Sequence, residues 1–299
     1  MASVSPMASA TVHAHCAAID TGFVAIGAVK VAFLGVVQGI SELLPISSTA
    51  HLRAIPAFLG WPDPGSAFSA AMQLAALAAV VTYFWTDIER SVTGSIRAIR
   101  RRDWHDFELR LAVAVIIATI PIVVAGASLS NVLNACNSPL RTPLVIGIAC
   151  LVMAALLALA EWLATHRRGT DKLTLRDGLL IGIAQVGALI PGVSRSGSTF
   201  TASLGLGFAR ADAARVSFLL GVPAIAAAGL HEIWELARFG LPLSGWITLG
   251  VGLIVSSQSS FLAIWGLMRF LERFSTWPLV IYRALFGVLL IGGVYAGWF

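Results

Sequence analysis

Two short stretches of the sequence gather polar and ionisable side chains among apolar ones. The first places a carboxylate, three hydroxyls and an imidazole close together, namely Glu42, Ser47, Ser48, Thr49 and His51. A serine with a carboxylate or a histidine beside it is suited to nucleophilic or general-base catalysis, because the base takes a proton from the hydroxyl or from a water. An ionisable group at membrane depth costs at least ~2.5 kcal/mol, so a function is its default explanation.

The residues around this cluster indicate how it is held. Gln38 and Glu42 are four apart, which places them on one face of a helix. Pro45 ends that helix, so the hydroxyls and N–H groups after it turn toward a shared cavity. Gln38, Ser47 and Thr49 are expected to contact the ligand. Glu42, with Gln38 as a second oxygen donor, is the candidate metal ligand, since Mg²⁺ and Ca²⁺ prefer oxygen.

The second stretch, PGVSRSGST at 191–199, places one arginine between hydroxyls and glycines. The planar guanidinium of Arg195 binds phosphate oxygens in pairs and is not neutralised by burial. Glycines let the backbone approach a ligand, and successive N–H groups at a helix start form an anion nest. A phosphate is therefore expected here, contacted by Arg195 and by Ser194, Ser196, Gly197 and Thr199.

Structural alternatives exist for these residues. Glu42 and Arg195 would also suit a buried ion pair that serves only the fold. Serines and threonines in membrane helices often bond back to the backbone. His51 would also suit a cap on the hairpin, and Arg53 an anchor at the membrane surface. The clustering of these groups in two short stretches favours chemistry.

The composition sets the class of protein. Of the 299 residues, 58% are hydrophobic and 12% charged, whereas soluble domains carry roughly 25% charged residues. The mean hydropathy of +0.86 comes from separate apolar blocks that approach the ~20 residues needed to cross a membrane. An all-α polytopic membrane bundle follows. The net charge of +5 lies in short arginine-containing loops, which indicates topology and not nucleic-acid binding. Cys16, Cys136 and Cys150 have neither disulfide nor metal-site spacing.

The order of the blocks predicts an inverted-topology repeat. Long blocks are expected at 67–86, 109–130, 142–163, 213–236, 244–268 and 280–299, and short ones at 22–37, 178–190 and 198–209. Basic loops at 87–108, 164–177 and 269–276 are expected in the cytoplasm, and loops at 131–141 and 237–243 outside. Each broken-helix, re-entrant hairpin then precedes three crossings, with directions reversed between the halves. In such repeats, broken helices meet near the midplane and form the site.

We expect a single transmembrane domain at 22–299, with repeats at about 22–163 and 178–299. Residues 1–21 contain no Lys or Arg, so they lack the charged start of a signal peptide and are expected to form a disordered tail. The two histidines there, His13 and His15, are expected to be incidental.

At these stretches the chain resembles the undecaprenyl-diphosphatase family of bacterial inner membranes, known for bacitracin resistance. The resemblance covers nearly all of 25–299. It is carried by GVVQGISELLPISSTAHL at 35–52 and PGVSRSGST at 191–199, with MQLAALAAVV around Gln73, SFLLGVP at 217–223 and IYR at 281–283 in support.

The resemblance implies hydrolysis of undecaprenyl diphosphate to the monophosphate carrier of peptidoglycan synthesis. It also implies dependence on Mg²⁺ or Ca²⁺, a site open to the periplasm, and homodimers. The family's catalytic residues fall on Glu42, Ser48, His51 and Arg195. Gln38 stands where many relatives have Glu, leaving one carboxylate fewer for a metal.

Two questions stay open at the level of sequence. Either Ser48 attacks the terminal phosphorus with His51 or Glu42 as base, or one of these bases activates a water. The rival function is a transporter or flippase of a phosphate-bearing prenyl lipid, since inverted repeats with broken helices are typical of secondary transporters.

Overall fold

The protein is a bundle of membrane-length helices. The computed structural model describes residues 21–133 and 139–298, and within them the only β-type pairing is an isolated bridge between Arg168 and Phe208. Among the described residues, six helical segments are long and apolar enough to cross a membrane: Ser66–Tyr83, Phe107–Leu129, Pro143–Leu163, Arg210–Phe239, Leu243–Arg273 and Trp277–Tyr295. They confirm the six long blocks expected from the sequence and the all-α membrane class.

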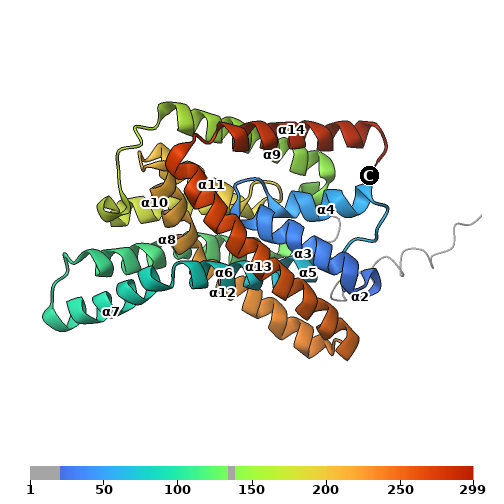
Figure 1. Ribbon diagram of the computed structural model, residues 1–299, viewed down its shortest axis with the longest axis horizontal. Helices are drawn as coiled ribbons and strands as arrows, with labels where there is room; N and C mark the ends of the chain where they lie inside the picture. The colour runs from blue at the N-terminus through green and yellow to red at the C-terminus, as the bar shows by residue number, and fades with distance from the viewer. Residues whose placement is uncertain (1–20, 134–138, 299) are drawn as a thin grey trace, which may run out of the picture.

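The helices follow one another with short connections (Figure 1). In chain order they are α2 (Phe23–Ile26), α3 (Ala28–Leu43), α4 (Ser48–Phe58), α5 (Ser66–Ala71), α6 (Gln73–Tyr83), α7 (Trp85–Arg101), α8 (Phe107–Leu133), η1 (Pro139–Arg141), α9 (Pro143–Leu163), η2 (Thr170–Lys172), α10 (Leu175–Val186), η3 (Gly187–Leu189), α11 (Arg195–Gly205), α12 (Arg210–Phe239), α13 (Leu243–Arg273) and α14 (Trp277–Tyr295).

Two broken-helix hairpins, α3–α4 and α10–α11, interrupt this series of long helices. Leu44 ends α3 in an extended conformation with φ −71° and ψ 145°, as expected for the residue before a proline. The second turn contains Pro191 and Gly192, and Gly192 has a φ of +97°. An added Cβ at Gly192 would lie 2.7 Å from the Ile146 carbonyl oxygen, so the backbone conformation and the close packing both require glycine.

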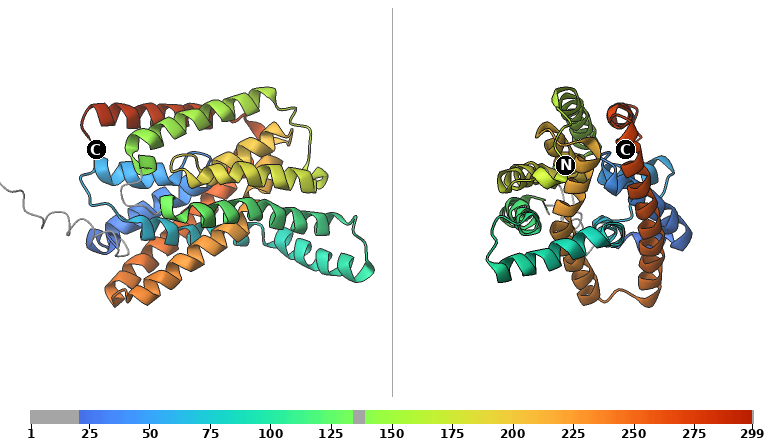
Figure 2. Two further views of the ribbon diagram at one scale, coloured as in Figure 1. Left: turned by 180° about the vertical axis from the view of Figure 1, so that it is seen from behind. Right: turned by 60° about the vertical axis from the view of Figure 1, so that its left-hand side comes forward.

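The two turns lie side by side in the middle of the molecule (Figure 1; Figure 2, left). Around them α3 packs on α13, α9 on α14 and α10 on α8. The connections α7–α8, α9–α10 and α13–α14 lie at one end of the bundle, as the basic loops predict. The order of one hairpin followed by three long spans occurs twice, and the symmetry between the halves stays a prediction.

One stretch expected to be a loop is largely helical. Most of 87–108 belongs to α7, in which arginines alternate at helical spacing with apolar residues such as Val92, Ile96 and Ile99, all three exposed. The charges alone are typical of a loop, but their helical spacing with apolar residues produces an amphipathic helix. Except for Thr21, the predicted tail lies outside the described residues, and so do its residues His13, His15 and Cys16. Cys136 also lies outside them. Cys150 is a buried free thiol.

Candidate active site

Glu42 is the centre of a hydrogen-bond cluster at the end of α3. Its Oε2 accepts hydrogen bonds from Ser48 Oγ at 2.6 Å and from Gln38 Nε2 at 3.0 Å. Gln38 lies one turn earlier on the same helix face, as the spacing of four predicts. Ser48 is the first residue of α4, so the turn at Pro45 brings its hydroxyl back onto the carboxylate. A base and a hydroxyl therefore touch within the first hairpin.

Arg195, the first residue of α11, contacts the other oxygen of this carboxylate. Its Nη2 donates to Glu42 Oε1 at 2.9 Å, and its Nη1 donates to the Gly221 carbonyl at 3.2 Å. Ser196 Oγ donates to the carbonyl oxygens of Glu42 and Leu44 at 2.8 Å and 3.2 Å. The two hairpins thus meet face to face through residues that are 153 positions apart in the sequence.

Both helices that carry this cluster begin after a serine in an unusual conformation. Ser47 precedes α4 with φ 74°, and Ser194 precedes α11 with φ 67°. A non-glycine residue in such a region costs on the order of 1–3 kcal/mol and persists only where its surroundings enforce it. The strain lies directly before Ser48 and Arg195, so it fixes the directions in which their side chains leave the turns.

Arg283 on α14 is the residue that holds the two turns together. Its side chain is fully buried, with 0% exposed. Nη1 donates to the Pro45 carbonyl at 2.7 Å, and Nη2 donates to the carbonyls of Gly192 and Val193 at 2.7 Å and 2.6 Å. One guanidinium therefore connects both turns at the points where they would otherwise leave buried carbonyls without donors.

Among the described residues, His51 forms no hydrogen bond with Ser48 or Glu42. Its Nδ1 lies 2.7 Å from the Ser47 carbonyl, which only accepts, so Nδ1 carries a proton. Nε2 lies 2.7 Å from the Tyr282 hydroxyl, and the ring stacks on Phe286 at 4.1 Å between centroids. Both ring nitrogens are therefore hydrogen-bonded, and His51 stabilises the strained turn through its bond to the Ser47 carbonyl. Of the two bases considered for Ser48, only Glu42 is within hydrogen-bond reach.

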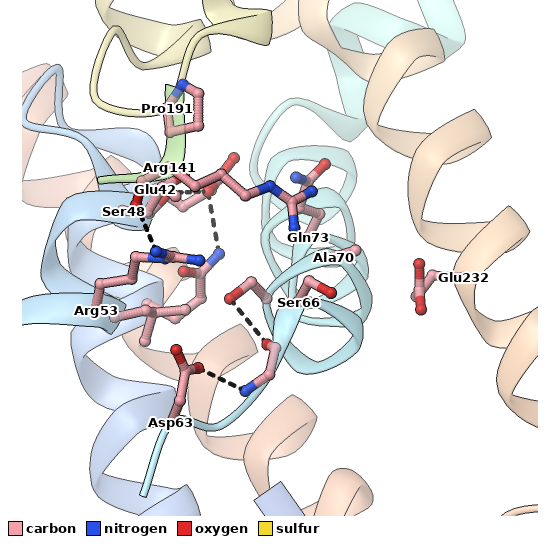
Figure 3. A pocket seen from close by; sticks show the side chains of 15 residues that line it. Glu42, Ser48, Arg53, Asp63, Ser66, Ala70, Gln73, Arg141, Pro191 and Glu232 are labelled. Carbon is pink, nitrogen blue, oxygen red and sulfur yellow. Dashed lines mark hydrogen bonds between the residues drawn. The ribbon is translucent and has the colours of Figure 1, made fainter. Parts of the chain in front are cut away.

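A polar cavity of about 340 Å³ opens in front of the Ser48–Glu42 contact (Figure 3). It is lined by Gln38, Glu42, Ser48 and Thr49 from the first hairpin, by Pro191 from the second, by Gln73 and neighbours from α5–α6, and by Arg53, Asp63, Arg141 and Glu232 around them. The volume lies at the lower end of small-molecule sites. It suits a headgroup better than a long apolar chain, which would stay in lipid.

Arg195 and the remaining phosphate ligands predicted on the two hairpins are not among the residues that line this cavity, and Arg195 reaches it only through its contact with Glu42. Ser194 Oγ accepts from the Gly197 N–H at 3.1 Å and caps α11. Thr199 donates to the Arg195 carbonyl and shares a hydrogen bond with a serine of α12. Ser196 bonds the first hairpin, as above, and Ser47 is buried. These four hydroxyls and Gly197 hold the hairpins in this structure, and their assignment to phosphate stays a prediction.

The oxygen donors near Glu42 fit a cation that binds together with phosphate. Gln38 Oε1 is buried without a hydrogen-bond partner, although the amide borders the cavity. Within the described ranges, no three His, Cys, Asp or Glu side chains come together as a metal site. One carboxylate and one amide oxygen are too few for a protein cage, but Mg²⁺ commonly binds one or two carboxylates plus substrate phosphates.

Three side chains of this region were missed from the sequence. Arg283 and Tyr282 lie in the IYR segment, which entered only as supporting similarity. The signal for Arg283 was present, because an arginine in the middle of an apolar span is functional or structural by default. Arg141 is the last residue of the outer loop predicted at 131–141, and nothing in the sequence places it beside Arg53.

The class of protein follows from three features. These are membrane-length helices, two hairpins that meet between them, and a cluster of serine, carboxylate and arginine beside a polar cavity. This is an integral membrane protein with a buried site suited to phosphoryl chemistry. Residues 31–289 match the family described as bacitracin resistance protein BacA, and the chain belongs to that family.

Its curated relatives agree. The chain is 65% identical to undecaprenyl-diphosphatase 2 of Mesorhizobium japonicum, over 87% of this chain and 99% of the relative. It is 51% identical to undecaprenyl-diphosphatase of Gloeobacter violaceus, over 91% of this chain and 93% of the relative. It is 46% identical to that of Synechocystis, over 94% and 88% respectively. These similarities confirm the family expected from the two motifs.

Proposed function

We propose that this protein hydrolyses undecaprenyl diphosphate to undecaprenyl phosphate and inorganic phosphate. The names of the relatives support the substrate. The observation that carries the proposal is the contact of Ser48 Oγ with Glu42 at 2.6 Å beside Arg195, at the edge of a polar cavity. A site that only bound the lipid would need no base on a hydroxyl.

In this mechanism Ser48 attacks the terminal phosphorus and Glu42 takes the hydroxyl proton. The bond between the terminal phosphorus and the bridging oxygen breaks, its electrons stay on the bridging oxygen, and Glu42 passes its proton to the departing undecaprenyl phosphate. A water then attacks the phosphoserine with Glu42 as base, which releases inorganic phosphate and restores Ser48. In the alternative route a water replaces Ser48 as nucleophile, and Glu42 keeps its role.

Arg195 supplies positive charge as the reaction proceeds. In the resting site it pairs with Glu42 Oε1 at 2.9 Å, so its charge lies beside the group that accepts the proton of Ser48. Once Glu42 takes the proton of Ser48 it becomes neutral and the ion pair weakens. The guanidinium then becomes available to the phosphoryl oxygens, whose negative charge it stabilises.

A divalent cation belongs to the same proposal. Gln38 Oε1 and Glu42 would hold it, and when bound it would neutralise negative charge on the diphosphate. We further propose that the protein lies in the bacterial inner membrane as a homodimer, with the cavity open to the periplasm. The basic loops at the opposite end of the bundle support this direction. Activity there would recycle the peptidoglycan carrier lipid and confer bacitracin resistance.

The test is phosphate release by purified protein in detergent micelles, which contain no compartments. Wild type should release inorganic phosphate from undecaprenyl diphosphate, and Ser48→Ala should lose at least about 10³-fold in kcat. Ser41→Ala is the matched control, because Ser41 is a buried serine of the same hairpin that bonds only the Val37 carbonyl.

Two outcomes would change the proposal. A Ser48→Ala rate within about tenfold of wild type, or ~1.4 kcal/mol, would assign the attack to water. Wild-type protein that releases no phosphate in micelles, yet moves the lipid between leaflets of vesicles, would be a flippase.

A further inference from the structure

Two arginines from different elements lie together at the cavity. Arg53 comes from α4 and Arg141 from η1, and both line the cavity. Arg53 Nη1 donates to the Arg141 carbonyl at 2.6 Å, which ties the two segments together. Figure 3 shows both side chains directed into the space that Ser48, Glu42 and Gln73 border. The arrangement brings two guanidinium groups into the same polar cavity, that of Arg53 from the first hairpin and that of Arg141 extending toward Gln73 (Figure 3).

Neither guanidinium forms an ion pair with an acidic side chain of the described residues. The other two acids of the cavity, Asp63 and Glu232, lie beyond ion-pairing distance, and Asp63 accepts from the Gly65 N–H. Burial lowers the pKa of Arg141 from its ordinary value, and the charge of Arg53 lowers it further. Two unpaired cations in a half-buried site repel each other, so an anion between them would be bound favourably.

The position of the pair relative to Ser48 suggests which anion it binds. Arg53 follows Ser48 by five residues on α4, a rise of about 7.5 Å toward the outer end of the hairpin. Side chains of a helix lean toward its N-terminus, so Arg53 leans back toward Ser48. Thr49 lies four residues before Arg53 and lines the same cavity. The arginines therefore lie outward of the reacting groups along a continuous polar surface.

We propose that Arg53 and Arg141 form a second phosphate subsite, which binds the phosphate that stays on the prenyl chain while the terminal phosphate reaches Ser48. This inference rests on the proposed function and specifies how that site selects its substrate. A diphosphate fills both subsites. A prenyl monophosphate has one phosphate, which the arginine pair holds at the cavity mouth away from Ser48. The pair thus allows hydrolysis of the diphosphate and protects the product from further hydrolysis.

Steady-state kinetics in micelles test the subsite. Arg53→Gln and Arg141→Gln should each raise KM for prenyl diphosphate about tenfold, as expected for loss of one charged hydrogen bond of ~1.4 kcal/mol. The same variants should raise the inhibition constant of prenyl monophosphate by the same factor, while kcat falls less than about threefold. Arg238→Gln is the matched control, because Arg238 is an exposed arginine of α12 outside the cavity. Arg53→Lys, which keeps the charge, should retain part of the affinity.

A competition experiment separates the two sources of a lipid phosphate. Farnesyl monophosphate and phosphatidylglycerol are titrated against wild type and against both variants. Inhibition by the prenyl monophosphate that weakens in the variants supports the subsite. If only the inhibition by phosphatidylglycerol weakens in the variants, the arginine pair binds bulk lipid and the subsite proposal is overturned.

The subsite and the proposed function fail in different ways. Folded variants with thermal stability and KM like those of wild type would overturn the subsite while hydrolysis stands. A wild-type protein that releases no phosphate but binds prenyl monophosphate less tightly when either arginine is changed would overturn hydrolysis alone. A fall in kcat with unchanged KM and monophosphate inhibition would place the arginines in catalysis and not in binding.

Discussion

Arg283 offers the sharpest test of how the site is held together. The change Arg283→Met keeps an unbranched apolar stem and removes the three hydrogen bonds to the carbonyls of Pro45, Gly192 and Val193. Hydrogen bonds from a charged group contribute ~1.5–3 kcal/mol each, so three sum to about 4–9 kcal/mol. Relief from burying the charge offsets part of this, and we expect a net loss of about 3–5 kcal/mol.

The expected consequence is loss of activity before loss of fold. Because Arg283 links the turn before Ser48 to the turn before Arg195, its removal should separate the nucleophile from the guanidinium. Thermal unfolding in detergent measures the stability, and kcat for phosphate release is measured well below the unfolding midpoint. Arg283→Lys restores a charge and up to three donors at one point, so it should recover part of both quantities.

A pair of glycine substitutions in α11 tests the position of the Arg283 guanidinium without changing the arginine itself. Gly197 and Gly205 both lie in α11, but an added Cβ would lie 2.5 Å from Arg283 Nη1 at Gly197 and would meet nothing within 4 Å at Gly205. Gly197→Ala should therefore disturb the guanidinium and lower kcat and stability, by about 1–3 kcal/mol in the latter. Gly205→Ala should be neutral or slightly stabilising.

The reasoning about Arg283 would be refuted by a particular combination of results. If Arg283→Met folds with a wild-type melting temperature and a wild-type kcat, the three hydrogen bonds do not position the turns. Equal effects of Gly197→Ala and Gly205→Ala would show that the substitution acts through the helix and not through the arginine.

Two further predictions concern the proton and the cation. Glu42→Gln should lower kcat about 10²–10⁴-fold, whereas His51→Asn, which loses the hydrogen bonds to Ser47 and Tyr282 and the stacking on Phe286, should cost much less. Profiles of kcat/KM against pH identify the general base. If the acidic limb is lost in His51→Asn but kept in Glu42→Gln, His51 is the base. Excess chelator should abolish phosphate release and added Mg²⁺ or Ca²⁺ should restore it, with Gln38→Met needing more cation for half-maximal rate. Full activity in chelator would remove the cation from the mechanism.

The sequence predicted the long helices and the meeting of the hairpins for simple physical reasons. A membrane span must be apolar over a fixed length, so hydropathy alone locates it. A carboxylate and a guanidinium buried in two broken hairpins each need a partner of opposite charge. Glu42 and Arg195 could therefore be placed together, and the 2.9 Å contact between them confirms that placement.

The parts that could not be predicted depend on contacts between distant segments. Arg283 and Pro45 are 238 positions apart, and no local pattern says which carbonyls a buried arginine will reach. The sequence allows two interpretations of His51, as a general base or as a cap on the hairpin. Its orientation depends on Tyr282 and Phe286 from the last helix, so a motif around residue 51 could not decide it. Arg141 likewise joins the cavity from η1, in a position that no local pattern predicts.

The chemistry of the site follows from how its buried charges are compensated. Glu42 accepts from Arg195, Ser48 and Gln38 at once, so its charge is stabilised by groups from both hairpins. Arg283 is compensated by three backbone carbonyls and no carboxylate, which leaves its charge fixed while protons move elsewhere. Among the residues that line the polar cavity, Glu42 is a carboxylate that accepts hydrogen bonds from both a hydroxyl and a guanidinium. Each hairpin alone would bury an uncompensated charge, so the charges that make the reaction feasible are also what hold the two halves of the protein together.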